Sequence, residues 1–154
     1  DAHFLFVGNG DEVDFLLSEK SKYDLHNITY VSSVTQDVYY NMLNEFDVGL
    51  FSLHKDHITH NFPGKLLGYM NCGKPILGCV NDKNDLQELV NKSNAGYIVP
   101  SGSHDKLENY ALLLLNNYAL RLSLGLNAKE LLENKFSIST VSKQLLSHFN
   151  LWNN

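Results

Sequence analysis

The sequence is poor in the features that mark several classes of protein. Arg121 is its only arginine and the net charge is −5, which argues against the basic surface that nucleic-acid binding needs. Its two cysteines, Cys72 and Cys79, lie in segments predicted to be buried, so free thiols in a reducing cytoplasm are favoured over a disulfide. The chain contains no Cys-x-x-Cys or Asp-x-Asp sequence, and we predict no metal centre.

Long hydrophobic runs are also missing. The longest, around Ala111–Leu115, is far shorter than a membrane span, so no transmembrane segment is expected. Asp1–Asn9 lacks a basic end and enters a strand-like run directly, which predicts no signal peptide. With 154 residues, 44% hydrophobic and 19% charged, the chain has the composition of one globular domain.

What is present is an alternation of short apolar runs with helical patterns, which indicates a parallel sheet covered by helices. The expected strands are His3–Val7, Ile28–Val31, Val48–Leu53, Pro75–Val80 and Gly96–Val99. The expected helices are Asp11–Lys20, Thr35–Asn44 with Thr35 as N-cap, one starting at Pro63, Asn84–Val90, His104–Asn116 with Ser103 as cap, Ala119–Asn134 and Ser139–Phe149. The predicted fold class is therefore α/β, a Rossmann-like sheet that ends in a run of helices.

The helix that starts at Pro63 has the clearest signals. Proline is favoured at a first helical position, and Gly73 stands where a left-handed C-terminal cap is expected. The N-terminus of a helix offers unpaired N–H groups, Gly64 allows close approach to the backbone, and Lys65 adds a cation. This combination suits a phosphate, although an ordinary capped helix with a solvated lysine explains the same pattern.

The run PGKLLGYMNCGKP, residues 63 to 75, resembles the donor-binding helix of retaining GT-B glycosyltransferases. It is most similar to the family 4 enzymes that build bacterial surface polysaccharides such as lipopolysaccharide and capsule, and Ala95–Pro100 also fits their pattern. The resemblance implies the C-terminal, Rossmann-like donor domain, without a cofactor. Its donor would be a nucleotide diphosphate sugar, with uridine as the base.

Two positions depart from the family pattern. The family has two glutamates in this region, and here His60 and Gly68 stand in their places. The second glutamate normally bonds the ribose hydroxyls, and Gly68 has no side chain for this. His60 retains the capacity to hydrogen-bond or to carry charge, and it is the one candidate for a catalytic role.

The resemblance also assigns the remaining site residues. For the nucleotide and its phosphates they are Gly8, Asn9, Gly10, Ser32, Ser33, Val34, Gly64, Lys65 and Gly68; for the donor sugar they are His60, Asn61, Phe62 and Pro63. Gly8–Gly10 and Ser32–Val34 each follow a predicted strand, and open α/β sheets bind ligands beyond the carboxyl ends of their strands. Without a ligand, Gly8–Gly10 is explained as a tight strand-to-helix turn, and Ser32–Val34 as a polar connection whose serines cap nearby N–H groups.

His54, His57 and His60 recur every third residue, with Asp56 among them. Imidazoles and a carboxylate can bind zinc, but this segment follows a strand and is predicted to be a loop. A polar loop near the acceptor sugar, or plain solvated histidines, are the favoured interpretations.

By resemblance, the acceptor is a saccharide or a lipid-linked saccharide, bound by an N-terminal domain that would precede Asp1 in the same protein. The isolated donor domain would then be inactive. The full-length protein would lie in the cytoplasm or at the inner face of the membrane. Two alternatives stay open. One is a sugar-nucleotide epimerase of the same fold, and the other is a degenerate, non-catalytic domain that serves assembly.

Overall fold

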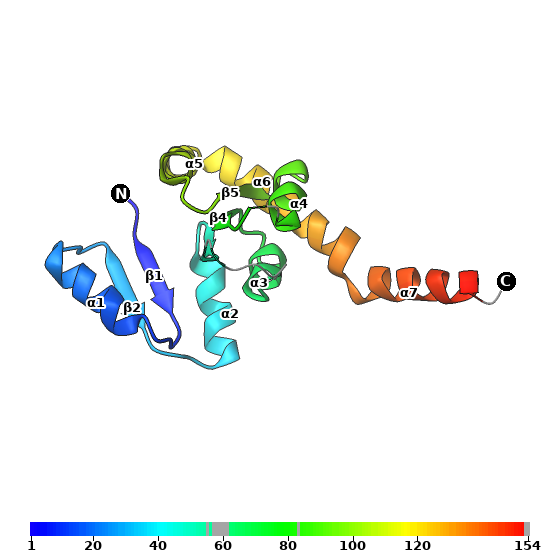
Figure 1. Ribbon diagram of the computed structural model, residues 1–154, viewed down its shortest axis with the longest axis horizontal. Helices are drawn as coiled ribbons and strands as arrows, with labels where there is room; N and C mark the ends of the chain where they lie inside the picture. Colours follow the sequence, from blue (N-terminus) through cyan, green and yellow to red (C-terminus); the bar gives the residue numbers. More distant parts are fainter. Residues whose placement is uncertain (55, 57–61, 83, 153–154) are drawn as a thin grey trace. The chain divides into compact units, whose positions relative to one another are not determined.

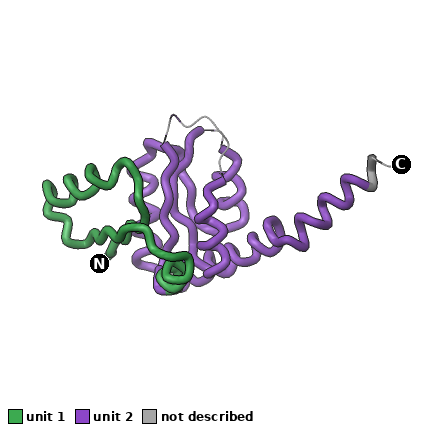
Figure 2. Tube along the Cα trace, turned by 90° about the horizontal axis from the view of Figure 1, so that it is seen from below, with its two compact units in different colours: residues 1–44 green, residues 45–154 purple. Residues whose placement is uncertain are grey.

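The computed structural model describes residues 1–54, 56, 62–82 and 84–152. The chain divides into two compact units, residues 1–44 and 45–154, which Figure 2 distinguishes by colour. The strands pair in parallel throughout, β1 with β2 in the first unit and β3-β4-β5 in the second. The predicted parallel arrangement is confirmed, and the described pairing is divided between two sheets.

The first unit is a βαβ unit with a following helix (Figure 1): β1 (Phe4–Val7), α1 (Val13–Lys22), β2 (Ile28–Val31) and α2 (Gln36–Glu45). Phe4 lies opposite Ile28, and Val7 lies opposite Val31. Bulky and β-branched residues of this kind favour strands because they pack well on a pleated surface. The two strands therefore end together, which places the turns that follow them side by side.

The second unit has three strands, β3 (Gly49–Ser52), β4 (Ile76–Val80) and β5 (Gly96–Pro100), linked by α3 (Lys65–Asn71) and α4 (Asp85–Lys92). Strand-helix-strand crossovers between parallel strands are right-handed, so the two successive crossovers place α3 and α4 on one face of this sheet. Figure 2 shows helices on both sides of the strands of this unit.

Four helical segments follow β5: α5 (His104–Asn116), α6 (Tyr118–Leu131), the π-helical turn η1 (Leu132–Phe136) and α7 (Ile138–Trp152). Helices α5 and α6 pack on the sheet through a buried cluster of Leu77, Leu114 and Leu124. The rings of Tyr97 and Tyr110 stack beside it, 4.1 Å apart between centroids. The predicted run of helices is confirmed.

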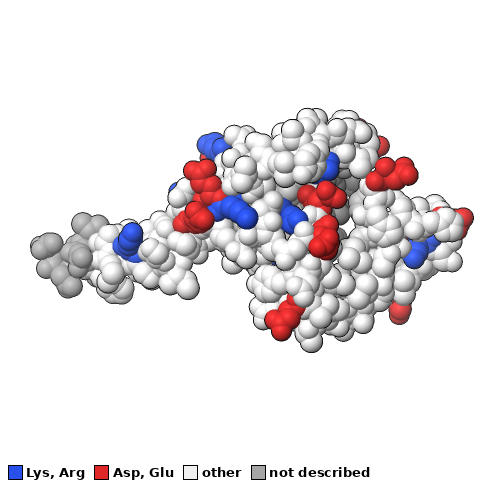
Figure 3. Space-filling model, turned by 180° about the vertical axis from the view of Figure 1, so that it is seen from behind, with Lys and Arg blue, Asp and Glu red and all other residues white. Residues whose placement is uncertain are grey.

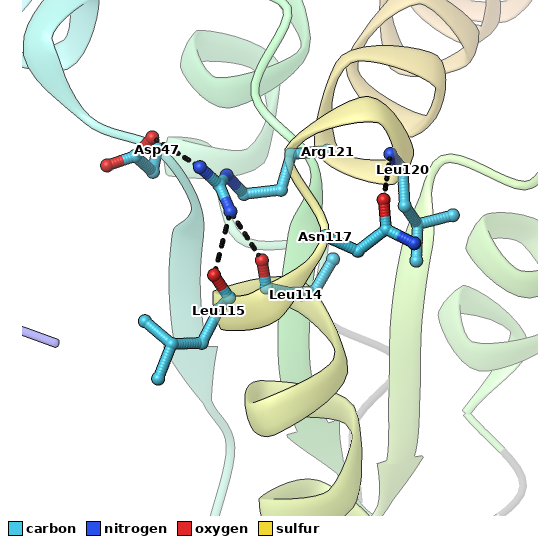
Figure 4. Close-up of polar contacts among 6 residues, drawn as sticks. All are labelled: Asp47, Leu114, Leu115, Asn117, Leu120 and Arg121. Atoms are coloured by element: carbon cyan, nitrogen blue, oxygen red, sulfur yellow. Dashed lines mark hydrogen bonds and ion pairs between the residues drawn. The ribbon is translucent and has the colours of Figure 1, made fainter. Parts of the chain in front are cut away.

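Arg121 joins α5 and α6 to the start of β3 (Figure 4). Its Nη1 donates to the carbonyl oxygens of Leu114 at 2.6 Å and Leu115 at 3.1 Å, and its Nη2 lies 3.4 Å from a carboxylate oxygen of Asp47. The last carbonyls of a helix have no partner within the helix, and a cation there also opposes the negative end of the helix dipole. The single arginine of the chain thus closes the end of α5.

Local chemistry differs from the prediction at two helix starts. Helix α3 begins at Lys65, because the Pro63 carbonyl accepts from Leu66 at 3.0 Å in a tight turn that precedes the regular helix. Ser103 occupies the N-cap position of α5, but its side chain makes no capping hydrogen bond. Asn84, by contrast, caps α4 by accepting from the amide of Leu86 at 3.0 Å.

Across the described helices, none is long and apolar enough to cross a membrane.

Candidate functional site

Helix α3 is held firmly against β3. The Tyr69 hydroxyl donates to the carbonyl oxygen of Leu50 at 3.0 Å, and the Tyr69 ring covers Gly49, where an added Cβ would lie 2.3 Å from it. Leu66 and Met70 on the same helix are fully buried. These contacts fix the orientation of α3, and therefore the direction in which its first turn faces.

The residues at the start of α3 combine a buried anchor with an exposed end. Pro63 is buried, whereas Gly64 and Lys65 are exposed. The amides of Leu66 and Leu67 bond to the carbonyls of Pro63 and Gly64, at 3.0 and 3.2 Å. The next N–H groups outward are those of Gly64 and Lys65, and the side chain of Lys65 carries an ammonium. This end of the helix has the donors and the charge that an anion requires.

Gly68 lies one helical turn after Gly64, and it is half-buried. Positions four residues apart share one face of a helix, and a side chain at the later position leans toward the helix N-terminus. A residue at Gly68 would therefore point toward the end at which Gly64 and Lys65 are exposed. The structure brings these three predicted residues together on one side of α3.

Phe62 makes a contact that the sequence did not predict. Its ring packs on Phe136 at the end of η1, with centroids 4.8 Å apart and an angle of 44° between the ring planes. Both rings are half-buried. No local pattern in the sequence indicates this pair, because the two residues are distant in the chain. Of the other predicted sugar-side residues, Pro63 is buried, whereas His60 and Asn61 lie outside the described residues.

In the first unit, the two predicted turns meet at the carboxyl ends of β1 and β2. The Asn9 side-chain oxygen accepts from the amide of Ser33 at 3.3 Å and from the Tyr30 hydroxyl at 3.4 Å. The Gly8 amide donates to the Val31 carbonyl at 3.0 Å, and its φ of +137° is one that glycine adopts readily. The structure therefore joins Asn9 to Ser33 and Gly8 to the last residue of β2, and Gly10, Ser32 and Val34 lie in the same two turns.

The carboxyl edge of the other sheet carries polar groups that sequence reasoning missed. Ser52 Oγ lies 3.1 Å from Cys79 Sγ, and Ser101 Oγ donates to the Leu53 carbonyl at 2.8 Å. Their signal in the sequence is their place at or just beyond strand ends, where ligands bind in open α/β sheets. Cys72 and Cys79 are free thiols, and both are half-buried rather than fully buried.

The histidine segment is described only in part. His54 Nδ1 accepts from the Asp56 amide at 3.3 Å, and both side chains are largely exposed. His57 and His60 lie outside the described residues. Elsewhere, in the residues that the structure places, no cluster of three potential metal ligands is found.

Charge does not gather into a basic surface on the face shown in Figure 3. Lysine and arginine side chains are interspersed there with aspartates and glutamates. This distribution agrees with the net charge of −5.

Comparison with known proteins identifies the family. The sequence model described as Glycosyl transferases group 1 matches residues 1–131. The chain belongs to this family. The match includes both turns of the first unit and the whole of α3, so each group of candidate residues lies within the matched range. In a search of curated proteins, no sequence matches the chain.

Solved glycosyltransferase structures share the fold. HepE from Anabaena, in complex with UDP, has a TM-score of 0.77 at 18% identity, over 97% of this chain and 41% of HepE. A TarM variant from S. aureus, in complex with fondaparinux, α-GlcNAc-glycerol and UDP, has a TM-score of 0.76 at 16% identity. That alignment covers 96% of this chain and 29% of TarM.

WaaG, a glycosyltransferase involved in lipopolysaccharide biosynthesis, has a TM-score of 0.70 at 17% identity, over 92% of this chain and 36% of WaaG. The chain therefore spans 29% to 41% of the length of these structures. At these identities the likeness shows the fold, and it confirms the predicted resemblance to a Rossmann-like GT-B domain. The finer assignment to family 4 stays a prediction.

Proposed function

We propose that this chain is the donor-binding part of a glycosyltransferase whose donor is a nucleotide diphosphate sugar, with UDP as the nucleotide. The observation that carries the proposal is the family match over residues 1–131, which includes the exposed Gly64–Lys65 end of α3. Two structures of the same fold, HepE and TarM, were solved in complex with UDP. The helix end and the cation of Lys65 supply the chemistry that a diphosphate needs.

In the proposed reaction, the bond between the sugar anomeric carbon and the diphosphate oxygen breaks. Negative charge then grows on the leaving diphosphate, where the amides of Gly64 and Lys65 and the Lys65 ammonium stabilise it. An acceptor hydroxyl forms the new bond to the anomeric carbon, and its proton passes to the departing diphosphate. Donors that are fixed before the reaction lower its barrier because they need not reorganise as the charge develops.

The remaining predicted residues are proposed contacts of the rest of the donor. Gly68 leaves the ribose without the carboxylate that the resemblance places there, so we propose that ribose is held by backbone groups or by water. Gly8, Asn9, Gly10, Ser32, Ser33 and Val34 are the proposed contacts of the base and its nucleotide. Phe62 and Pro63, with His60 and Asn61, are the proposed sugar side.

The acceptor would be a saccharide or a lipid-linked saccharide in surface polysaccharide synthesis, as the likeness to WaaG suggests for lipopolysaccharide. Because the chain spans 29% to 41% of TarM and HepE, we propose that a further domain of the same protein binds that acceptor. Two free thiols suit a reducing compartment, which favours the cytoplasm.

A second candidate is a degenerate domain that binds no donor and serves assembly. The glycine at position 68 favours it, since it removes a side chain that the family uses for ribose. The two candidates differ in one property, the binding of a nucleotide.

Calorimetric titration of the chain with UDP, GDP and ADP, with and without zinc, tests the proposal. Binding of UDP in preference to the others, unchanged by zinc, is the expected result. Preference for GDP or ADP would support a donor-binding domain but show that the base of its donor is not uridine. If neither the chain nor the full-length protein that contains it binds any of the three, the degenerate domain is the correct description.

A further inference from the structure

The contact between Phe62 and Phe136 joins the turn that leads into α3 to the end of η1, the π-helical turn that follows α6. Phe62 directly precedes Pro63 and Gly64, the turn that leads into α3. Phe136 is the last residue of η1. We propose that Phe136 is a positioning residue, which acts through Phe62 to hold the first turn of α3 in the orientation that binds the donor. This proposal rests on the proposed function.

The segment from α6 to η1 contacts α3 and its flanks at both ends. After the C-terminus of α3, Gly125 of α6 lies against the backbone of Gly73, where an added Cβ would be 2.0 Å from the Gly73 carbonyl oxygen. Before its N-terminus, Phe136 contacts Phe62. The two contacts are eleven residues apart on each segment. The continuous helical segment from α6 to η1 therefore contacts the chain just before and just after α3.

The π-helical geometry of η1 determines where Phe136 points. An α-helix turns by about 100° per residue, so the extra residue in a π-helical turn rotates every later side chain by about that angle. Had α6 continued as a regular helix, position 136 would face a different direction. The π-turn is thus the feature that brings the Phe136 ring to Phe62.

Polar contacts fix the end of this turn. Ser137 leaves helical geometry, with ψ of 145°, and its hydroxyl oxygen accepts from the Thr140 amide at 3.2 Å. The Thr140 hydroxyl in turn donates to the Glu133 carbonyl at 3.0 Å. These bonds close η1 and begin α7 at a defined residue. The backbone next to Phe136 is therefore fixed by these hydrogen bonds, in addition to the contact of its ring with Phe62.

The consequence for binding follows from the position of Phe62. Rings packed at an inclined angle occupy a favoured aromatic arrangement, so the pair restricts the backbone of Phe62 and, through it, that of Pro63 and Gly64. Donors at the start of α3 stabilise a diphosphate only if they point toward it. Small misplacements of positioning groups are known to cost large factors in catalysis.

The experiment compares UDP binding by the wild-type chain, Phe136→Ala, Phe136→Tyr and Phe149→Ala, by calorimetry. Phe149 is an exposed phenylalanine on α7 and serves as the matched control. We expect Phe136→Ala to weaken UDP binding about three- to tenfold, the scale of one aromatic pair. Phe136→Tyr, which keeps the ring, and Phe149→Ala should both bind UDP with wild-type affinity.

Thermal unfolding and hydrogen exchange accompany the titration. In Phe136→Ala the amides of Leu66 and Leu67 should exchange faster, while those of α4 should not, and unfolding should stay cooperative. If this variant fails to fold, Phe136→Leu, which keeps apolar volume but lacks the ring, takes its place.

Two results overturn the inference. One is that Phe136→Ala binds UDP as tightly as the wild-type chain; the other is that Phe149→Ala weakens UDP binding as much as Phe136→Ala does. If the wild-type chain and the full-length protein bind no nucleotide, the proposed function itself fails. In the full-length enzyme, Phe136→Ala should raise KM for the donor and leave KM for the acceptor unchanged.

Discussion

Gly125 lies backbone to backbone with Gly73: an added Cβ on Gly125 would be 2.0 Å from the Gly73 carbonyl oxygen and 3.7 Å from Cδ of Pro75. Gly73 itself has φ of +63°, the left-handed conformation that ends α3. The close approach of α6 to this turn therefore depends on the absence of a side chain at position 125. The turn that closes α3 also begins β4, so one contact serves two elements.

Gly125→Ala should destabilise the fold by about 1–3 kcal/mol, the usual cost of forcing an extra methyl group into a packed contact. In an open helix the same substitution stabilises, since alanine has the higher helix propensity. The sign of the change in the free energy of unfolding, measured with denaturant, therefore tests the contact. Gly64→Ala is the matched control, because an added Cβ there meets nothing within 4 Å. A stabilised Gly125→Ala would contradict the packing.

Arg121→Ala should lower the free energy of unfolding by about 1–3 kcal/mol, because it removes the donors to the carbonyls of Leu114 and Leu115. Arg121→Lys should restore only part of this, since an ammonium lacks the planar fork that serves several acceptors. Asp47→Ala is the control: its carboxylate is three-quarters exposed, so a small effect is expected. Equal losses for Arg121→Ala and Asp47→Ala would show that the ion pair, and not the carbonyl contacts, matters.

Lys65→Ala should weaken UDP binding by about 1–3 kcal/mol, the scale of a charge-assisted hydrogen bond. The proposed contact is with the diphosphate, so binding of uridine should change little. Lys106→Ala, which removes an exposed lysine from α5, is the matched control. Unchanged affinity for UDP in Lys65→Ala, measured by calorimetry, would exclude Lys65 from the phosphate site.

Gly68→Glu should tighten UDP binding, because it restores a carboxylate that can accept from the ribose hydroxyls. Gly68→Ala controls for the gain in helix propensity without supplying that acceptor. Comparison of UDP with inorganic diphosphate isolates the ribose-bearing part, for which only Gly68→Glu should improve affinity. If Gly68→Glu folds and binds UDP no better than Gly68→Ala, ribose is held elsewhere.

The hydrogen bond from Lys92, and then its charge, hold the pKa of Glu88 below its ordinary value of 4.5. A carboxyl whose pKa is lowered on folding stabilises the fold above the unfolded pKa, and this contribution is lost as the pH falls through the folded pKa. The expected window is thus below about pH 4.5. In Lys92→Ala an NMR titration should show the Glu88 pKa returning upward, whereas Lys106→Ala should leave it unchanged.

Much of this architecture follows from local chemistry. The predicted strand Ile28–Val31 and the predicted helix His104–Asn116 have the bounds found in the structure. Gly73 adopts the left-handed conformation expected of a glycine before a proline-bounded strand. The prediction that Gly8–Gly10 and Ser32–Val34 share one edge is also confirmed in placement, because parallel strands that start in register end together. Their contacts with a nucleotide stay predictions.

Other local predictions failed because competing bonds were available. The carbonyl of Pro63 bonds three residues ahead, so regular helix starts at Lys65 rather than at the proline. The predicted helix Ala119–Asn134 instead ends as α6 at Leu131 and continues as a π-turn to Phe136. Nothing in the spacing of its apolar residues marks that change of geometry.

Local sequence patterns are enough to predict the order of strands and helices and the glycine that ends α3, since each depends on neighbours within a few positions. The contacts of Phe62 with Phe136, of Gly73 with Gly125, and of Arg121 with the end of α5 arise only when the elements pack together. Each of these contacts depends on how one helix packs against another or turns back on it. Side-chain periodicity sets which face of a helix is buried, but it does not set which residue of another element that face will touch.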